Sequence, residues 1–113
     1  IYFRPGKIIQ AAKNLGVGQA ALEKTAEFVQ TYSRGGKLLI KHQIVASRLA
    51  DMATKVSAVR GLVMQAAKAV DQNTADSDAL CNMAKVFASE EILKVCQHAM
   101  ELHGGMGQCW MQG

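Results

Sequence analysis

The chain has 113 residues, and half of them are hydrophobic. This composition favours one folded domain and excludes an intrinsically disordered segment. The formal net charge of +4 is mild and the basic residues are spread along the chain, which argues against a nucleic-acid-binding protein. Aromatic residues make up only 5% of the chain, and the abundant Ala, Met, Val and Leu residues suit close helix packing better than a sheet.

The three cysteines, Cys81, Cys96 and Cys109, include no Cys-x-x-Cys pair. This pattern argues against a disulfide framework and against a structural zinc site, and it favours a reducing compartment. No apolar run approaches the length of a membrane span. Both ends of the chain lie in apolar stretches, Ile1-Tyr2-Phe3 and Trp110-Met111-Gln112-Gly113. We therefore expect residues 1–113 to be a piece of a larger protein, truncated at both ends.

The first expected helix begins near Pro5, which suits a first helical turn, and ends at Gly35-Gly36, which favour left-handed backbone. Gly16 and Gly18 weaken its middle by up to about 1 kcal/mol each relative to alanine. A helix that keeps them indicates close packing of another helix more than contact with a ligand. The expected apolar face comprises Ile8, Ala12, Leu15, Leu22, Ala26 and Val29.

The second expected helix, residues 37–71, is the most regular stretch of the chain. At about 1.5 Å per residue it would be roughly 50 Å long. Its apolar residues alternate at spacings of four and three, which is typical of a helix face packed against partner helices. They are Val45, Leu49, Met52, Val56, Val59, Val63, Ala66 and Val70.

The third expected helix, residues 77–103, carries two apolar stripes and ends at the glycine cluster 104–107. One stripe comprises Cys81, Ala84, Ala88, Ile92, Val95, Ala99 and Leu102, and the other Val86, Leu93, Cys96 and Met100. Two stripes require partners on two sides, so we expect a fourth helix or an oligomeric partner. With short connections, the prediction is an all-α, up-down antiparallel bundle containing three helices of an expected four.

The residues by themselves offer little catalytic chemistry. His98 and His103 are too far apart in register to share a helix face, and no metal-ligand spacing is present. Glu90, Glu91 and Glu101 have no evident partners, which favours surface carboxylates over an acid–base pair. The cluster 104–107 follows a helix, whereas a dinucleotide-binding loop follows a strand, so a plain helix end is favoured over a phosphate-binding loop.

Four blocks together resemble the C-terminal helical domain of the acyl-CoA dehydrogenase family. The chain also resembles the first helix of that domain over residues 15–22, and the likeness covers nearly all 113 residues. The blocks are His42-Gln43, Leu49-Ala50-Asp51-Met52, residues 83–90 and Gly104-Gly105-x-Gly107.

The resemblance implies an FAD-dependent flavoenzyme, usually a tetramer, whose C-terminal four-helix bundle packs against other subunits. Such an enzyme removes a proton from Cα and a hydride from Cβ of an acyl-CoA thioester, giving a trans-2-enoyl-CoA. Its electrons pass to an electron-transfer flavoprotein. The implied compartment is the mitochondrial matrix or the bacterial cytoplasm. The related acyl-CoA oxidase chemistry and a non-catalytic interaction bundle remain alternatives.

The resemblance also implies positions for the cofactor. Gln43 matches a glutamine that contacts FAD, and residues 101–105 (Glu101, Leu102, His103, Gly104 and Gly105) match a turn near the FAD of an adjoining subunit. Tyr32 stands where the family usually has an arginine that meets the FAD pyrophosphate, and Arg34 is the alternative source of that charge. Glu101 stands where the family usually has a glutamine, and its charge would repel a diphosphate unless it points elsewhere.

The family's catalytic base is a glutamate, which usually lies beyond the glycine turn and is expected outside this chain. In some members it comes from the start of the first helix, but Gly6 stands at that position. Lys7, beside it, matches a basic position and is the expected substrate-side residue. No catalytic residue and no metal ligand is expected within residues 1–113, so we expect this segment alone to be inactive.

Overall fold

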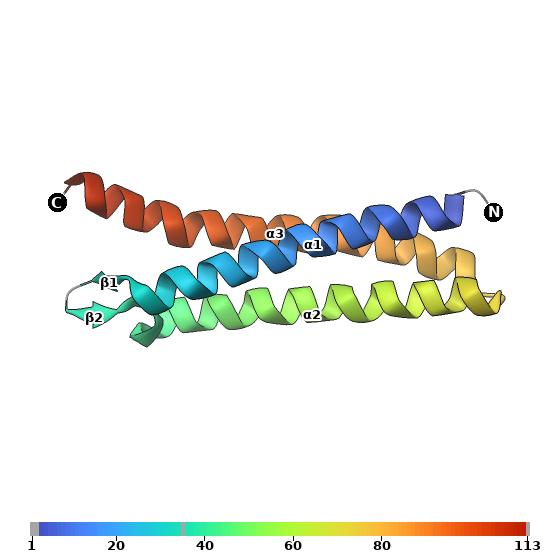
Figure 1. The fold of residues 1–113 in the computed structure, drawn as a ribbon, viewed down its shortest axis with the longest axis horizontal. Helices are drawn as coiled ribbons and strands as arrows, with labels where there is room; N and C mark the ends of the chain where they lie inside the picture. The colour runs from blue at the N-terminus through green and yellow to red at the C-terminus, as the bar shows by residue number, and fades with distance from the viewer. Residues whose placement is uncertain (1–2, 35, 113) are drawn as a thin grey trace.

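The computed structural model describes residues 3–34 and 36–112, with side chains described for residues 6–33, 36–38 and 40–104. Three long helices fill this part of the chain: α1 (Phe3–Thr31), α2 (Gln43–Gln72) and α3 (Ser77–Gln112). They run up, down and up along a bundle of 57 × 21 × 16 Å (Figure 1). The prediction of an all-α, antiparallel bundle is confirmed.

The regular apolar face of α2 forms the centre of the core, as its spacing predicts. Most of the predicted residues are buried, while Leu49 and Val70 pack against the core from partly exposed positions. The first stripe of α3 meets this face. The buried residues of α2 are Val45, Met52, Val56, Val59, Val63, Ala66 and Ala69, and those of α3 include Cys81, Ala84, Ala88, Ile92, Val95 and Ala99.

The inward face of α1 lies one position away from the predicted one near its start. Ala11 is fully buried, whereas Ala12 is exposed. Thr25 is also fully buried although it is polar. This face has the same alternating spacings of three and four residues as α2, but a glycine and a threonine interrupt its apolar pattern and hide it in the sequence. Its residues are Ile8, Ala11, Leu15, Gly18, Leu22, Thr25 and Val29.

Gly18 lies where α1 and α3 approach closely. A Cβ atom at this position would overlap Cδ1 of the buried Ile92 and lie 3.4 Å from its Cγ1 and Cγ2 atoms. The predicted tight packing is therefore confirmed at Gly18. Gly16 differs, because a Cβ added there would meet no atom within 4 Å.

The connection between α1 and α2 differs from the prediction. Helix α1 ends at Thr31, and a two-stranded hairpin follows, β1 (Ser33–Arg34) and β2 (Lys37–Leu38), with Ser33 opposite Leu38. Gly36 turns this hairpin with a φ of 77°, while Gly35 lies outside the described residues. After the short helix η1 (Leu39–Lys41), α2 begins at Gln43 rather than at Lys37. The helical pattern misplaced this start because residues 37–38 pair with residues 33–34 as strands, and this pairing takes up their backbone hydrogen bonds instead.

The predicted C-terminal end is confirmed for α2 and wrong for α3. Helix α2 stops at the polar run as expected: Asn73 is left-handed (φ 52°, ψ 48°), and its N–H donates to the carbonyls of Ala69 and Val70. Helix α3 continues past the glycine cluster 104–107 to Gln112, so the predicted stop there is wrong. Glycine costs a helix only about 1 kcal/mol, and this does not by itself end it.

The second stripe of α3 lies mainly on the surface. Val86, Leu93 and Met100 are 54%, 60% and 66% exposed, while Cys96 is half-buried against the core. Towards the start of α3 the stripe borders a shallow, mainly apolar groove of about 450 Å³ against α2. Leu62, Asn82, Met83, Val86, Phe87 and Glu90 line this groove. An apolar stripe of this length on one helix face is typical of a surface that another helix covers.

Candidate functional site

The end of the bundle that carries the hairpin, here called the hairpin end, gathers most of the sequence-predicted site residues. Tyr32 follows α1, Gln43 begins α2, and Leu102 lies in α3, whose C-terminal part runs along this end (Figure 1). A small apolar cluster holds the three helices together here. It comprises Val29 and Val45, fully or almost fully buried, with Phe28, Tyr32, Ile40, Leu49 and Leu102 packed around them.

His103 faces inward, towards α1. Its Nε2 atom lies 3.3 Å from Oγ1 of Thr25, which gives the buried hydroxyl a hydrogen-bond partner. The imidazole also packs on the Phe28 ring at 4.4 Å between centroids, and Phe28 packs on Tyr32 at 5.2 Å. His103 thus fixes α3 against α1 at the hairpin end, and the ring contacts account for its orientation.

The start of α2 has the chemistry of a site for an anionic group. Nε2 of His42 is buried and has no hydrogen-bond partner among the described residues, while Gln43 beside it is exposed. The first turn of α2 contains no acidic residue, and Lys37 and Lys41 just before it are exposed. Free N–H groups and the helix dipole favour negative charge at such a terminus. These residues fit a phosphate-containing cofactor such as FAD.

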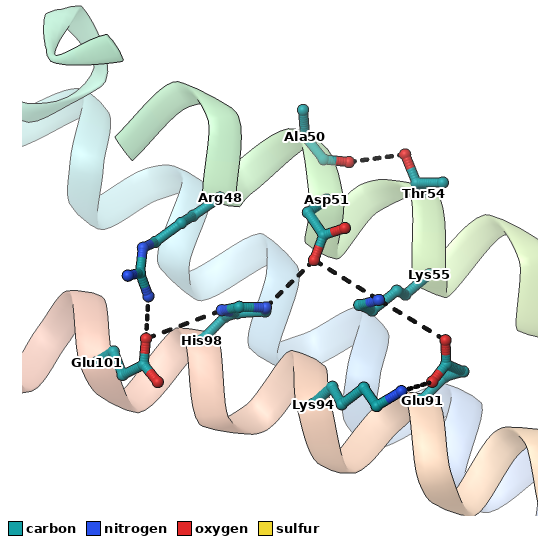
Figure 2. A network of polar contacts seen from close by, with 9 residues as sticks. All are labelled: Arg48, Ala50, Asp51, Thr54, Lys55, Glu91, Lys94, His98 and Glu101. Carbon is teal, nitrogen blue, oxygen red and sulfur yellow. Dashed lines mark hydrogen bonds and ion pairs between the residues drawn. The ribbon is translucent and has the colours of Figure 1, made fainter. Parts of the chain in front are cut away.

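Glu101 has partners in the structure, although the sequence shows none for it. Its Oε2 atom accepts a hydrogen bond from Nη1 of Arg48 in α2, and the same oxygen lies 3.9 Å from Nδ1 of His98 (Figure 2). The carboxylate therefore points sideways towards α2, and its charge is offset by a guanidinium. This orientation meets the condition under which a carboxylate at this position is compatible with a nearby diphosphate.

Beyond Glu101 the polar contacts between α2 and α3 continue as a ladder. Nε2 of His98 lies 3.2 Å from Asp51, and Nζ of Lys55 lies 3.6 Å from Asp51 and 3.7 Å from Glu91. Glu91 also pairs with Lys94 at 2.9 Å (Figure 2). The prediction that Glu91 has no partner is wrong. Its spacing of three from Lys94 was a usable signal, whereas the Lys55 contact depends on how the helices pack.

The hydrogen bond from Lys94 is the main reason that the pKa of Glu91 lies below its ordinary value of 4.5. Partial burial opposes this effect, and the charge of Lys55 adds to it. The same hydrogen bond raises the pKa of Lys94. The ladder is therefore a set of ion pairs that aligns two helices, with Lys55 and Glu91 more buried than the other members.

Lys7 lies far from the other predicted site residues. Its Nζ atom donates a hydrogen bond to Oδ1 of Asn82, near the start of α3. At about 1.5 Å per residue, the helix separates Lys7 from Tyr32 by nearly 40 Å. The structure thus brings the expected cofactor residues together but puts Lys7 at the opposite end of the bundle.

The remaining predicted residues are described only in part. Arg34 belongs to β1, and Gly105 to α3, but their side-chain surroundings lie outside the described residues. Gly104 is exposed, and a Cβ added there would meet no atom within 4 Å. Within the described part of the chain, no cluster of three or more His, Cys, Asp or Glu residues could hold a metal ion, and no helix is long and apolar enough to cross a membrane.

Comparison with known proteins gives a consistent result. Residues 2–112 match the family model described as acyl-CoA dehydrogenase, C-terminal domain. The chain is 33% identical over 102 residues to the mitochondrial isobutyryl-CoA dehydrogenase of Bos taurus, covering 90% of this chain and 24% of that protein. It is 35% identical over 102 residues to the caffeyl-CoA reductase-Etf complex subunit CarC of Acetobacterium woodii, covering 90% and 27%.

A solved structure agrees with these relatives. Butyryl-CoA dehydrogenase from Megasphaera elsdenii superposes with a TM-score of 0.86 at 33% identity, covering 92% of this chain and 27% of that one. The chain thus spans about a quarter of the length of the relatives it matches. The match over residues 2–112 means that the chain belongs to the acyl-CoA dehydrogenase family, in the part that forms its C-terminal domain.

Proposed function

We propose that residues 1–113 are part of an FAD-dependent acyl-CoA dehydrogenase. The observation that carries this proposal is the match of residues 2–112 to the family's C-terminal domain. The complete enzyme takes a proton from Cα of an acyl-CoA thioester and a hydride from Cβ, and a trans-2-enoyl-CoA remains. Bound FAD supplies the hydride acceptor. The base is a glutamate outside these residues.

Within that enzyme, the hairpin end contributes contacts to FAD. The proposed residues are Tyr32, Arg34, Gln43 and the segment 101–105, in which the carboxylate of Glu101 itself is turned towards α2 and does not contact the cofactor. Support comes from the Nε2 atom of His42, which has no hydrogen-bond partner among the described residues, from the acid-free start of α2 and from the open space around Gly104. This nitrogen in particular calls for a polar partner, because a buried polar atom without one is costly. Lys7 belongs to the substrate side, at the other end of the bundle.

The second part of the proposal is that the subunits pack into a tetramer and that a fourth helix completes each bundle. The exposed apolar stripe of α3 supports this part. Three of its four residues are more than half exposed. The proposed electron acceptor is an electron-transfer flavoprotein, supported by the name of the Acetobacterium woodii relative, a subunit of a caffeyl-CoA reductase-Etf complex. The proposed setting is fatty acid metabolism, in the mitochondrial matrix or the cytoplasm.

Purification of the full-length protein tests the proposal. We expect a yellow, flavin-containing protein whose flavin absorbance is bleached by an acyl-CoA without oxygen. Transfer of the electrons to an electron-transfer flavoprotein identifies a dehydrogenase, whereas rapid reoxidation by oxygen with peroxide formation identifies an acyl-CoA oxidase. A colourless protein that takes up no FAD refutes both and leaves a non-catalytic interaction bundle.

Gly104→Leu tests the placement of the cofactor. A Cβ atom added there meets no atom within 4 Å, so we expect the fold to persist while the affinity of the full-length apoprotein for FAD falls by roughly tenfold or more. Gly16→Leu is the matched control, because Gly16 is also an exposed helical glycine with open space around it. Equal FAD affinity of the two variants would remove Gly104 from the proposed site.

A further inference from the structure

The negative charge of Glu101 is unfavourable near the proposed cofactor site, and the contacts of this residue explain how the charge is accommodated. Its side chain is 55% exposed and directly precedes Leu102 and His103, in the segment proposed to approach FAD. A free carboxylate there would repel the two negatively charged phosphates of the cofactor. Because solvent screens an exposed charge only partly at low ionic strength, this repulsion would weaken cofactor binding.

The hydrogen bond to this carboxylate comes from the neighbouring helix. Arg48 of α2 contacts Oε2 of Glu101 through Nη1. His98 lies 3.9 Å from the same oxygen, but its Nδ1 atom has no hydrogen-bond partner among the described residues and its Nε2 atom is turned to Asp51 (Figure 2). Arg48 is therefore the group that directs the Glu101 carboxylate towards α2.

On the basis of the proposed function, we propose that Arg48 is a positioning residue for the cofactor. It holds Glu101 against the flank of α2 and cancels its charge, so that this turn of α3 presents a neutral surface to the FAD diphosphate. Arg48 acts through Glu101 and does not itself bind the cofactor. Removing Arg48 should thus weaken FAD binding only while Glu101 remains ionised.

Four variants of the full-length protein separate this role from a merely structural one. Arg48→Met keeps the long side chain without its charge, and Glu101→Gln removes the carboxylate with little change in shape. The double variant combines them. Glu91→Gln is the matched control, since it also turns a carboxylate of the α2–α3 ladder into an amide but about ten residues away, roughly 15 Å along the helix. The measurement is the dissociation constant of FAD from the apoprotein, followed by flavin fluorescence at low and high salt.

We expect Arg48→Met to weaken FAD binding by roughly threefold to tenfold at low salt, with a smaller loss at 1 M salt, where charges are screened within about 3 Å. Glu101→Gln and Glu91→Gln should bind FAD at least as well as the wild type. The double variant should recover the affinity of Glu101→Gln, which a structural role of Arg48 would not produce.

Two results would overturn the inference alone. One is that the wild-type protein binds FAD and that Arg48→Met binds it with the same affinity. The other is a double variant as weak as Arg48→Met, which would mean that Arg48 touches the cofactor or maintains the fold. A wild-type protein that takes up no FAD instead refutes the proposed function, and the inference falls with it.

Discussion

At the scale of single residues, Gly18 and Gly16 show that two identical residues in one helix can have opposite reasons to be there. Gly18 is buried where Ile92 crosses α1, whereas Gly16 faces open space. Glycine weakens a helix equally at both positions. The surroundings decide whether a larger residue in place of the glycine fits without a clash or forces α1 and α3 apart.

Gly16→Leu should stabilise the protein and Gly18→Leu should destabilise it. The first gains about 0.5–1 kcal/mol of helix propensity without a clash, while the second overpacks a closed contact, which typically costs about 1–3 kcal/mol. Urea denaturation of the two variants checks this. Equal free energies of unfolding would mean that Ile92 can move aside freely.

The lowered pKa of Glu91 predicts a dependence of stability on pH. The folded state favours the ionised carboxylate, so its contribution is present above pH 4.5 and is lost as the pH falls through the lowered folded pKa. Glu91→Gln should cost less than about 1 kcal/mol at pH 7. Thermal melts should show this difference shrinking below pH 4.5, and a difference that stays constant down to pH 2 would contradict the assignment.

At the scale of elements, the helix ends depend on backbone conformation more than on composition. Asn73 ends α2 because it adopts a left-handed conformation and its N–H caps the carbonyls of the last turn. The cluster 104–107 contains three glycines, yet α3 runs through it. Glycine permits a left-handed ending but does not enforce one.

Asn73→Gly should preserve or slightly raise stability, whereas Asn73→Val should lower it by about 1–2 kcal/mol, because a β-branched residue is strained in the left-handed region. Comparing the two melting temperatures with that of the wild type checks the prediction. If valine is tolerated as well as glycine, the end of α2 does not need its left-handed residue.

At the scale of the whole molecule, the bundle is long and thin, so each helix keeps a broad surface outside the core. α3 illustrates this: its first stripe is buried, whereas Val86 and Leu93 on its second stripe are 54% and 60% exposed. Covering them would remove apolar surface from water, with about 25 cal/mol gained per Å². The proposed tetramer is a way to gain that energy.

The double variant Val86→Glu/Leu93→Glu should therefore lower the assembly state of the full-length protein without unfolding its subunits. Val17→Glu is the control, as Val17 is also 54% exposed but lies on α1. Light scattering gives the mass and circular dichroism the helix content. A full-size assembly in both variants would show that the second stripe of α3 is not an interface.

The sequence by itself determined the elements whose pattern is local. The spacing of three and four in α2 predicted its buried face almost residue by residue, because a helix of fixed pitch brings those positions to one side. The same reasoning identified the two stripes of α3 and the all-α bundle. The resemblance then singled out Tyr32, Gln43 and Leu102, which the fold brings to one end.

Only the tertiary structure decided which partners those elements meet. The burial of Ala11 instead of Ala12, the Thr25–His103 contact and the α2–α3 ladder all depend on how helices dock, and no spacing within one helix encodes this. The hairpin between Ser33 and Leu38 likewise replaced a predicted helix start, since its backbone hydrogen bonds come from pairing across a turn. Contacts between residues distant in sequence are set by packing, whereas periodicity reports only the face that packs.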